Sequence, residues 1–271
     1  MQNFFSILGK SPGKTAVILC AVHGDEICGV RAVEKACKNI KIDSGVVHFI
    51  VGNPKALEER KRFIDVNLNR LFRDDKDLSR EEKQSHEYKR SREIIPYLLE
   101  SDVLLDLHSS ASSQTKTFAI CEEHSFVVAK KLPVEIISSG WDSLEPGGTD
   151  YFMNKQGKIG ICVECGNHDD PKAEEVAYGS ITSFLKSFGI LFGETETGTK
   201  KKWVRVNSIY RTRVDFKPHK VFADFEFVRE GERVGVDGGE EVCVEKNGYL
   251  IFCRERKASN EEAFVFAEDE N

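Results

Sequence analysis

Long apolar segments are absent from this chain of 271 residues. No apolar run approaches the roughly 20 residues that a membrane-spanning helix needs, so we expect no membrane partner. The N-terminal sequence MQNFFSILGKSPGK has only a very short apolar stretch and no basic region before it. We therefore expect no signal peptide and a cytoplasmic location.

An excess of positive charge is also absent. The formal net charge is −6 at pH 7, so the chain lacks the broad basic field that nucleic-acid-binding proteins use. Apolar residues make up 40% and charged residues 31%, which is the balance of an ordinary globular protein. The length suits one large domain with or without a small appendage, and we expect no nucleic-acid partner.

A disulfide framework is not expected, although the chain has eight cysteines. In a chain of this length without a secretion signal, reduced and mostly buried thiols are the more common state. Cys162 and Cys165 form a CxxC pair, but they fall in a predicted buried strand at residues 159–165. Residues three apart on a strand point to opposite faces, so we expect these thiols not to converge on a metal ion.

Strand-like and helix-like segments alternate over the first two thirds of the chain. Apolar runs at residues 15–22, 45–51, 102–107 and 160–165 predict buried strands, and shorter runs at 118–121 and 134–138 predict two more. Helical patterns cover residues 26–40, 79–99 and 173–188, and Ser79 with Glu82 forms a capping box. Residues 55–77 are polar and predict a long ordered loop. The alternation predicts an α/β fold, with a mostly parallel mixed central sheet flanked by helices.

The character of the sequence changes after about residue 193. Residues 193–202 (GETETGTKKK) are typical of a linker. Short strand-like runs follow at residues 203–210, 221–228, 242–245, 249–254 and 263–267, with turn signals between them. We therefore predict two domains, an α/β domain at residues 1–193 and a small all-β domain at residues 203–271.

Residues suited to a metal ion follow two of the predicted strands. His23-Gly24-Asp25-Glu26 stands where the strand at 15–22 ends, and His108 follows the strand at 102–107. Ligands bind at the carboxyl ends of strands in parallel sheets, so we expect these side chains to meet. Each histidine alone is equally consistent with a surface or capping role. Together, two histidines and one glutamate suit Zn²⁺ and leave a position for water, which predicts one zinc ion per chain.

Two further segments carry side chains suited to hydrolysis. Glu164 ends the predicted strand at 160–165, where a carboxylate is unusual and is placed to act as a general base; a structural ion pair or helix cap is the alternative. In the loop at 55–77, Arg62 suits a developing oxyanion, and Asn69 with Arg70 offers donors for a carboxylate. A solvated surface loop is the alternative for that segment taken alone.

The motifs His-Gly-Asp-Glu, Asn-Leu-Asn-Arg-Leu-Phe, Asp-Leu-His and Val-Glu-Cys-Gly occur in this order within residues 15 to about 190. The ordered set resembles the succinylglutamate desuccinylase/aspartoacylase family of the zinc carboxypeptidase superfamily. The resemblance implies a β-rich second domain and zinc ligands at His23, Glu26 and His108. It implies Glu164 as base and then acid, Arg62 as oxyanion stabiliser, and Asn69 with Arg70 as the site for the substrate's α-carboxylate.

The chain departs from the family pattern at three places. Asn67 stands where the family usually has an Asp that supports the first zinc histidine; Asn accepts a hydrogen bond there but adds no charge. An Arg that aspartoacylases carry before the catalytic Glu has no match in residues 151–155, where Lys155 is the available cation. A substrate-contacting Tyr near the C-terminus has no clear match in residues 256–259.

These observations predict a zinc-dependent amidohydrolase that cleaves the linear amide bond of a small N-acyl amino acid. Two alternatives stay open: a carboxypeptidase-like metallopeptidase, which a broad open pocket would favour, and a non-catalytic zinc-binding scaffold, which the departures favour. The retained Glu164 argues against the scaffold, since a scaffold needs no general base. The sequence leaves the acyl group, the amino acid and the oligomeric state undetermined, and a homo-oligomer is compatible with it.

Overall fold

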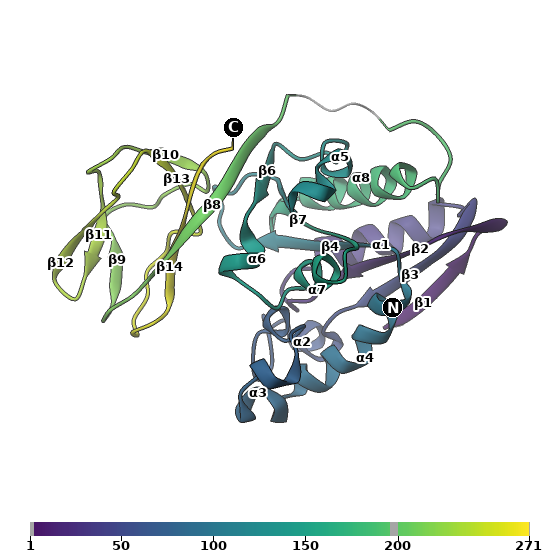
Figure 1. Ribbon diagram of the computed structural model, residues 1–271, viewed down its shortest axis with the longest axis horizontal. Coiled ribbons are helices and arrows are strands. Elements are labelled where there is room, and N and C mark those ends of the chain that lie inside the picture. Colours follow the sequence, from purple (N-terminus) through teal and green to yellow (C-terminus); the bar gives the residue numbers. More distant parts are fainter. Residues whose placement is uncertain (1–2, 196–199, 271) are drawn as a thin grey trace.

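A large sheet runs through the computed structural model, which describes residues 3–195 and 200–270 (Figure 1). Its eleven strands have the order β1-β3-β2-β4-β7-β5-β6-β8-β14-β13-β10, and a separate sheet has the order β12-β11-β9. The strands are β1 (Phe4–Leu8), β2 (Ser11–Cys20), β3 (Ser44–Val51), β4 (Val103–Ser110), β5 (Phe118–Ile120), β6 (Ile136–Ser139), β7 (Ile159–Asn167), β8 (Lys202–Arg211), β9 (Phe216–Pro218), β10 (Glu226–Val228), β11 (Arg233–Asp237), β12 (Glu240–Cys243), β13 (Gly248–Ile251) and β14 (Glu262–Asp269).

The interior of the large sheet is mostly parallel. Strand β2 pairs in parallel with β3 and β4, β4 with β7, β5 with β6, and β6 with β8. The other strand pairs of this sheet are antiparallel. The predicted α/β class, with a central sheet flanked by helices, is confirmed.

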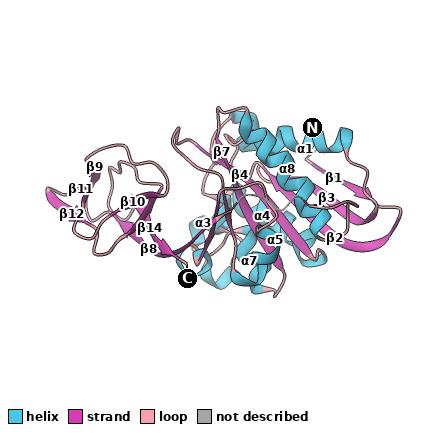
Figure 2. Ribbon diagram, turned by 90° about the horizontal axis from the view of Figure 1, so that it is seen from above, coloured by secondary structure: helices cyan, strands magenta, loops and turns pink. Residues whose placement is uncertain are grey.

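Helices cover both faces of the sheet (Figure 2). Alternate residues of β2 enter two cores: Ile18 packs in the core that contains residues of α1 and α8, and Leu19 in the core that contains residues of α4 and α7. The helices are α1 (Cys28–Asn39), α2 (Pro54–Glu59), α3 (Arg80–Gln84), α4 (His86–Glu100), α5 (Phe126–Ala129), α6 (Trp141–Leu144), α7 (Thr149–Lys155) and α8 (Lys172–Ser187), with 3-10 turns η1 (Leu68–Arg70), η2 (Asp75–Asp77) and η3 (Glu123–Ser125). Within the described ranges, no helix has the length and apolar character needed to cross a bilayer.

Two predicted elements differ from the structure. The helix predicted at residues 79–99 is broken at Ser85, whose extended backbone ends α3 and whose hydroxyl caps α4 by accepting from the Tyr88 N–H. The predicted capping box of Ser79 and Glu82 is present at the start of α3. The loop predicted at residues 55–77 contains α2, η1 and η2, which are too short to show a helical repeat in the sequence.

The C-terminal strands extend the central sheet, because β8 pairs in parallel with β6. Figure 1 shows β9 to β14 gathered at one end of the molecule. The strand predicted at 221–228 is confined to β10, and β9 and β11 form in segments for which no strand was predicted. Part of the predicted linker, residues 196–199, lies outside the described residues. The division into domains at 1–193 and 203–271 stays a prediction.

Candidate active site

A sharp turn after β2 places His23 and Glu26 in the protein interior. Ala21 has a φ of 51°, in the left-handed region that few non-glycine residues adopt. Gly24 lies against α2 so closely that a Cβ there would be 2.0 Å from the Ala56 carbonyl carbon. Glycine is therefore required at this position. The turn leaves His23 4% and Glu26 1% exposed.

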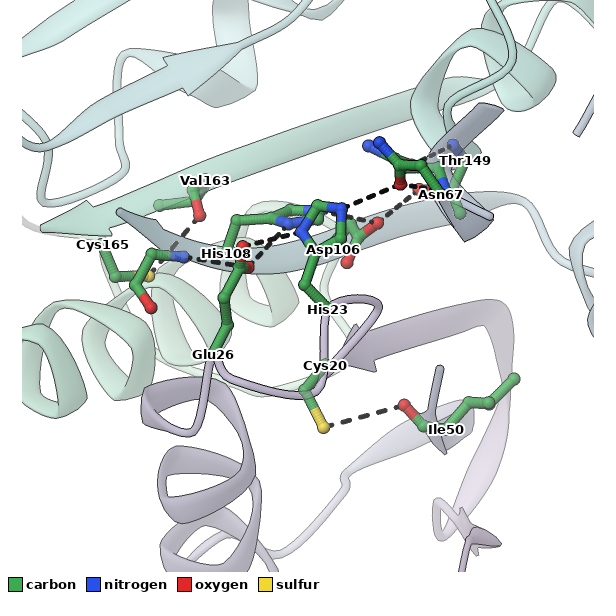
Figure 3. A network of polar contacts seen from close by, with 12 residues as sticks. Cys20, His23, Glu26, Ile50, Asn67, Asp106, His108, Thr149, Val163 and Cys165 are labelled. Atoms are coloured by element: carbon green, nitrogen blue, oxygen red, sulfur yellow. Dashed lines mark hydrogen bonds and ion pairs between the residues drawn. The ribbon is translucent and has the colours of Figure 1, made fainter. Parts of the chain in front are cut away.

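His23, Glu26 and His108 meet at the carboxyl ends of β2 and β4 (Figure 3). The Nδ1 atom of His23 lies 2.7 Å from Glu26 Oε1, and the Nδ1 atom of His108 lies 2.9 Å from Glu26 Oε2. All three side chains are buried, with their ligand atoms within 4.8 Å of one another. The structure thus brings the three residues into a group that could hold a metal ion.

The other nitrogen of each imidazole ring faces an oxygen acceptor. His23 Nε2 lies 3.0 Å from Asn67 Oδ1, and His108 Nε2 lies 3.1 Å from Asp106 Oδ2. In neutral rings these neighbours favour a proton on Nε2 and a lone pair on Nδ1, although the contact of His108 Nε2 with Asp106 falls outside hydrogen-bond geometry. Both Nδ1 lone pairs then face carboxylate oxygens of Glu26, an arrangement that a bound cation stabilises. The donor set therefore fits a divalent metal ion.

Glu26 is also bound by donors from two other segments. It accepts from the Arg62 guanidinium at 3.1 Å and from the Ser109 N–H at 3.2 Å. Burial alone would raise the pKa of Glu26, but when His23 and His108 are protonated, their charges and hydrogen bonds hold it well below its ordinary value. Glu26 is thus ionised at neutral pH, as a metal ligand must be.

Glu164 lines the same cavity from β7. It is the register partner of His108 in the parallel pair of β4 and β7. Burial, together with the charge of Glu26, raises the pKa of Glu164 to about 8. Within the described ranges its Oε2 atom is buried and has no hydrogen-bond partner. A carboxyl group in this position is suited to proton exchange near neutral pH.

Arg62, Asn69 and Arg70 line the cavity from the segment between α2 and α3. The Asn69 N–H donates to Asn67 Oδ1 at 3.0 Å. Arg70 pairs with Glu145, with 2.5 Å between Nη2 and Oε1. Burial raises the pKa of Glu145 to about 7 despite the charge of Arg70. The guanidinium that the sequence assigns to a substrate carboxylate thus already has a carboxyl neighbour.

The buried carboxylate of Glu87 organises this segment from beneath. Glu87 is 0% exposed and accepts from the N–H groups of Ile64, Asp65 and Val66 at 2.7, 3.1 and 3.2 Å. It also accepts from Asn53 Nδ2 at 2.9 Å. Four donors on one buried carboxylate fix the path of the chain that leads from Arg62 to Arg70.

The Succinylglutamate desuccinylase/Aspartoacylase catalytic domain model matches residues 12–184. The chain belongs to this family. It is 25% identical to the succinylglutamate desuccinylase of Idiomarina loihiensis, over 94% of this chain and 83% of that protein. It is 26% identical to the N-alpha-acetyl-L-2,4-diaminobutyric acid deacetylase of Halomonas elongata, over 70% of this chain and 59% of that protein. The crystal structure of succinylglutamate desuccinylase from Vibrio cholerae has the same fold, with a TM-score of 0.82 at 19% identity over 100% of this chain and 86% of that chain.

In this member of the succinylglutamate desuccinylase/aspartoacylase family, Lys155 was the available cation for the position of the missing arginine. Lys155 does not replace the missing arginine, because it pairs with Asp74 at 2.9 Å and does not line the cavity. The short helix α7 directs its side chain to that partner.

The two thiols of the CxxC pair lie apart, as expected. Cys162 lines the cavity, and Cys165 is buried in the core beside α1 and α8.

Sequence reasoning missed several residues of this family member's site. Asp106 could have been found, because it stands two residues before His108 on one strand and therefore shares its face. It also accepts from the Thr149 hydroxyl at 2.6 Å. Other charged residues of the cavity carry no local signal, because they come from distant segments; they are Asp142, Glu145, Asp150, Arg254, Arg256 and Glu262.

Proposed function

We propose that this chain hydrolyses the amide bond of a small N-acyl amino acid, with one zinc ion on His23, Glu26 and His108. The observation that carries the proposal is the buried trio with Glu164 in the same cavity. Membership of the family supports it, since relatives are named as a desuccinylase and a deacetylase. The chemistry of two imidazoles and one carboxylate supports zinc in particular.

Glu164 is proposed to act twice in one turnover. Zinc on the three ligands would supply Lewis-acid activation of water and of the acyl carbonyl. Glu164 takes a proton from the water whose oxygen bonds to the acyl carbon. It then delivers that proton to the amide nitrogen as the carbon–nitrogen bond breaks, which releases a carboxylic acid and an amine. The burial of Glu164 and its unpaired Oε2 atom, within the described ranges, support this exchange of protons.

The segment from Arg62 to Arg70 is proposed to bind charge on the substrate. Arg62 is half exposed and lies beside Glu26, where its guanidinium stabilises negative charge on the acyl oxygen during attack. Asn69 and Arg70 bind the α-carboxylate of the amino acid. Arg70 then exchanges part of its contact with Glu145 for the substrate.

A carboxypeptidase-like metallopeptidase is the second candidate. The cavity has a volume of about 370 Å³, and C-terminal side chains such as Arg254 and Phe264 form part of its wall. That volume is near the lower end for small-molecule pockets and favours a small substrate over a peptide. The unpaired oxygen of Glu164 likewise favours an enzyme over a non-catalytic zinc-binding scaffold.

Replacing Glu164 by alanine tests the proposal. Turnover of N-acetyl and N-succinyl amino acids should be lost while one zinc ion per chain, measured by elemental analysis, stays bound. Glu175→Ala, at an exposed position on α8, is the matched control and should keep full activity. A chelator should abolish wild-type activity and added zinc should restore it. An active Glu164→Ala variant would remove this residue from the mechanism, and zinc without turnover of any acyl amino acid or peptide would support the scaffold.

A further inference from the structure

Two arginines that the proposed mechanism does not use line the cavity. Arg254 and Arg256 follow β13 and approach the site from the C-terminal strands. The backbone of Arg256 is fixed by a two-way bridge to Phe216, with N···O distances of 2.9 and 2.8 Å. The segment that presents the two guanidinium groups is thus anchored to the small sheet.

The terminal nitrogens of both guanidinium groups have no carboxylate partner within the described ranges. Arg256 donates from Nε to the Glu262 carbonyl at 2.6 Å, and Arg254 donates from Nε to the Phe252 carbonyl at 3.3 Å. These contacts orient the groups but do not neutralise their charge. The other two cavity arginines differ, since Arg62 and Arg70 each pair with a glutamate.

Two nearby acidic residues have contacts with other groups. Glu262 pairs with Arg211 at 2.8 Å, and Asp224 accepts from the Phe252 N–H at 2.7 Å. Burial lowers the pKa of Arg254, and the positive charges of Arg256 and Arg62 lower it further. The charges of Asp224 and Glu164 act in the opposite direction, but within the described ranges neither carboxylate bonds a terminal nitrogen of these arginines, so an anion from outside the chain can accept from those donors.

We propose that Arg254 and Arg256 bind a second carboxylate of the substrate, in addition to the α-carboxylate at Asn69 and Arg70. The proposal rests on the proposed function. Paired planar guanidinium groups suit a carboxylate, because each offers two parallel donors. The second carboxylate belongs either to the acyl group or to the amino-acid side chain, and the experiment separates these sources. Both residues determine specificity and take no part in bond cleavage.

Binding of matched ligand pairs to the zinc-loaded full chain tests the proposal without turnover. Succinate against succinamate probes the acyl source, and glutamate against glutamine probes the side-chain source. In at least one pair the wild type should bind the dicarboxylate about tenfold or more tightly, and an Arg254→Gln/Arg256→Gln variant should lose that preference. Arg229→Gln, an exposed arginine outside the cavity, should keep it. Absence of a preference in the wild type, or its survival in the double variant, would overturn the proposal.

Kinetics then separate specificity from a structural role. N-succinyl-L-alanine and N-acetyl-L-glutamate each carry one more carboxylate than N-acetyl-L-alanine. The double variant should lower the ratio of kcat/KM for the preferred dicarboxylate over N-acetyl-L-alanine about 10- to 100-fold, mainly through KM, and lysine at both positions should restore part of it. An equal loss for all three substrates would contradict the assignment. Failure of the wild type to hydrolyse any of them, with the binding preference intact, would contradict the proposed function alone.

Discussion

Replacing Glu87 by glutamine is expected to destabilise the protein and to loosen the segment that carries Arg62, Asn69 and Arg70. The change keeps the volume of the side chain and removes its charge. One oxygen of Glu87 accepts from Ile64 and from Asn53, and the other accepts from two further backbone N–H groups. In either orientation of the glutamine amide, two donors therefore face an NH2 group.

The size of the effect follows from the lost hydrogen bonds. Each hydrogen bond to a charged group contributes about 1.5 to 3 kcal/mol, so losing two lowers the free energy of unfolding by about 3 to 6 kcal/mol. For a chain of this size the melting temperature should fall by about 10 °C. No water can replace the partners without rearrangement, because Glu87 is fully buried. The loss of order should also lower kcat/KM, since the guanidinium groups of this segment must be held in place.

Urea unfolding, followed by tryptophan fluorescence, measures the free energy of unfolding. Hydrogen exchange at the N–H groups of residues 64–66 measures the local loosening, which should be faster in the variant. Glu93→Gln is the matched control, because Glu93 lies on the same helix, is 64% exposed and pairs with Arg90. Its effect should stay within about 0.5 kcal/mol. The reasoning is refuted if Glu87→Gln changes the free energy of unfolding by less than about 0.5 kcal/mol and hydrogen exchange at residues 64–66 stays slow.

The pH dependence of this effect has a definite sign. Burial raises the pKa of Glu87, but its hydrogen bonds outweigh burial and hold the pKa below the ordinary value. A lowered pKa contributes stability above the unfolded value of about 4.3, and the contribution is lost as pH falls through the folded pKa. The difference in stability between the wild type and Glu87→Gln should therefore shrink below about pH 4.

Two further substitutions test the surroundings of the site. Asn67→Asp adds negative charge 3.0 Å from His23 Nε2, so zinc should bind about tenfold more tightly in chelator competition; equal or weaker binding would contradict the role of Asn67 as support for His23. Burial and the charge of Asp150 raise the pKa of Asp142 to about 7, so the wild type should lose stability as pH rises from about 4 to 7. Asp142→Asn should flatten that loss in urea unfolding at pH 5 and pH 8, and an unchanged pH profile would contradict it.

The central sheet and the metal-ligand group could be predicted because both depend on short, local patterns. Continuous apolar runs mark β2, β4 and β7, which are buried on both faces. Parallel neighbours end at one edge of the sheet, so the residues that follow these runs come together in space. His23, His108 and Glu164 occupy such positions, and their placement follows without knowledge of any loop.

The segment between β3 and α3 was predicted poorly because a distant side chain determines its structure. Its order comes from Glu87, which lies more than 20 residues further along the chain and was read only as part of a charged helix. The contact of Arg70 could not be predicted for the same reason, since its partner Glu145 is separated from it by 75 residues. Pairings of this kind depend on tertiary packing, and no spacing rule in the sequence specifies them.

The wall formed by the C-terminal strands escaped prediction for a related reason. Strand β8 pairs with β6 and continues the sheet, so that β14 and the segment after β13 line the cavity. The metal-ligand group lies at the ends of buried central strands, where almost every substitution disturbs the core. Arg254 and Arg256 lie beyond the end of a strand, on a segment that can change with little cost to the core. With the proposed role of these two arginines, substitutions on this wall alter the choice of substrate while the metal-ligand group stays intact.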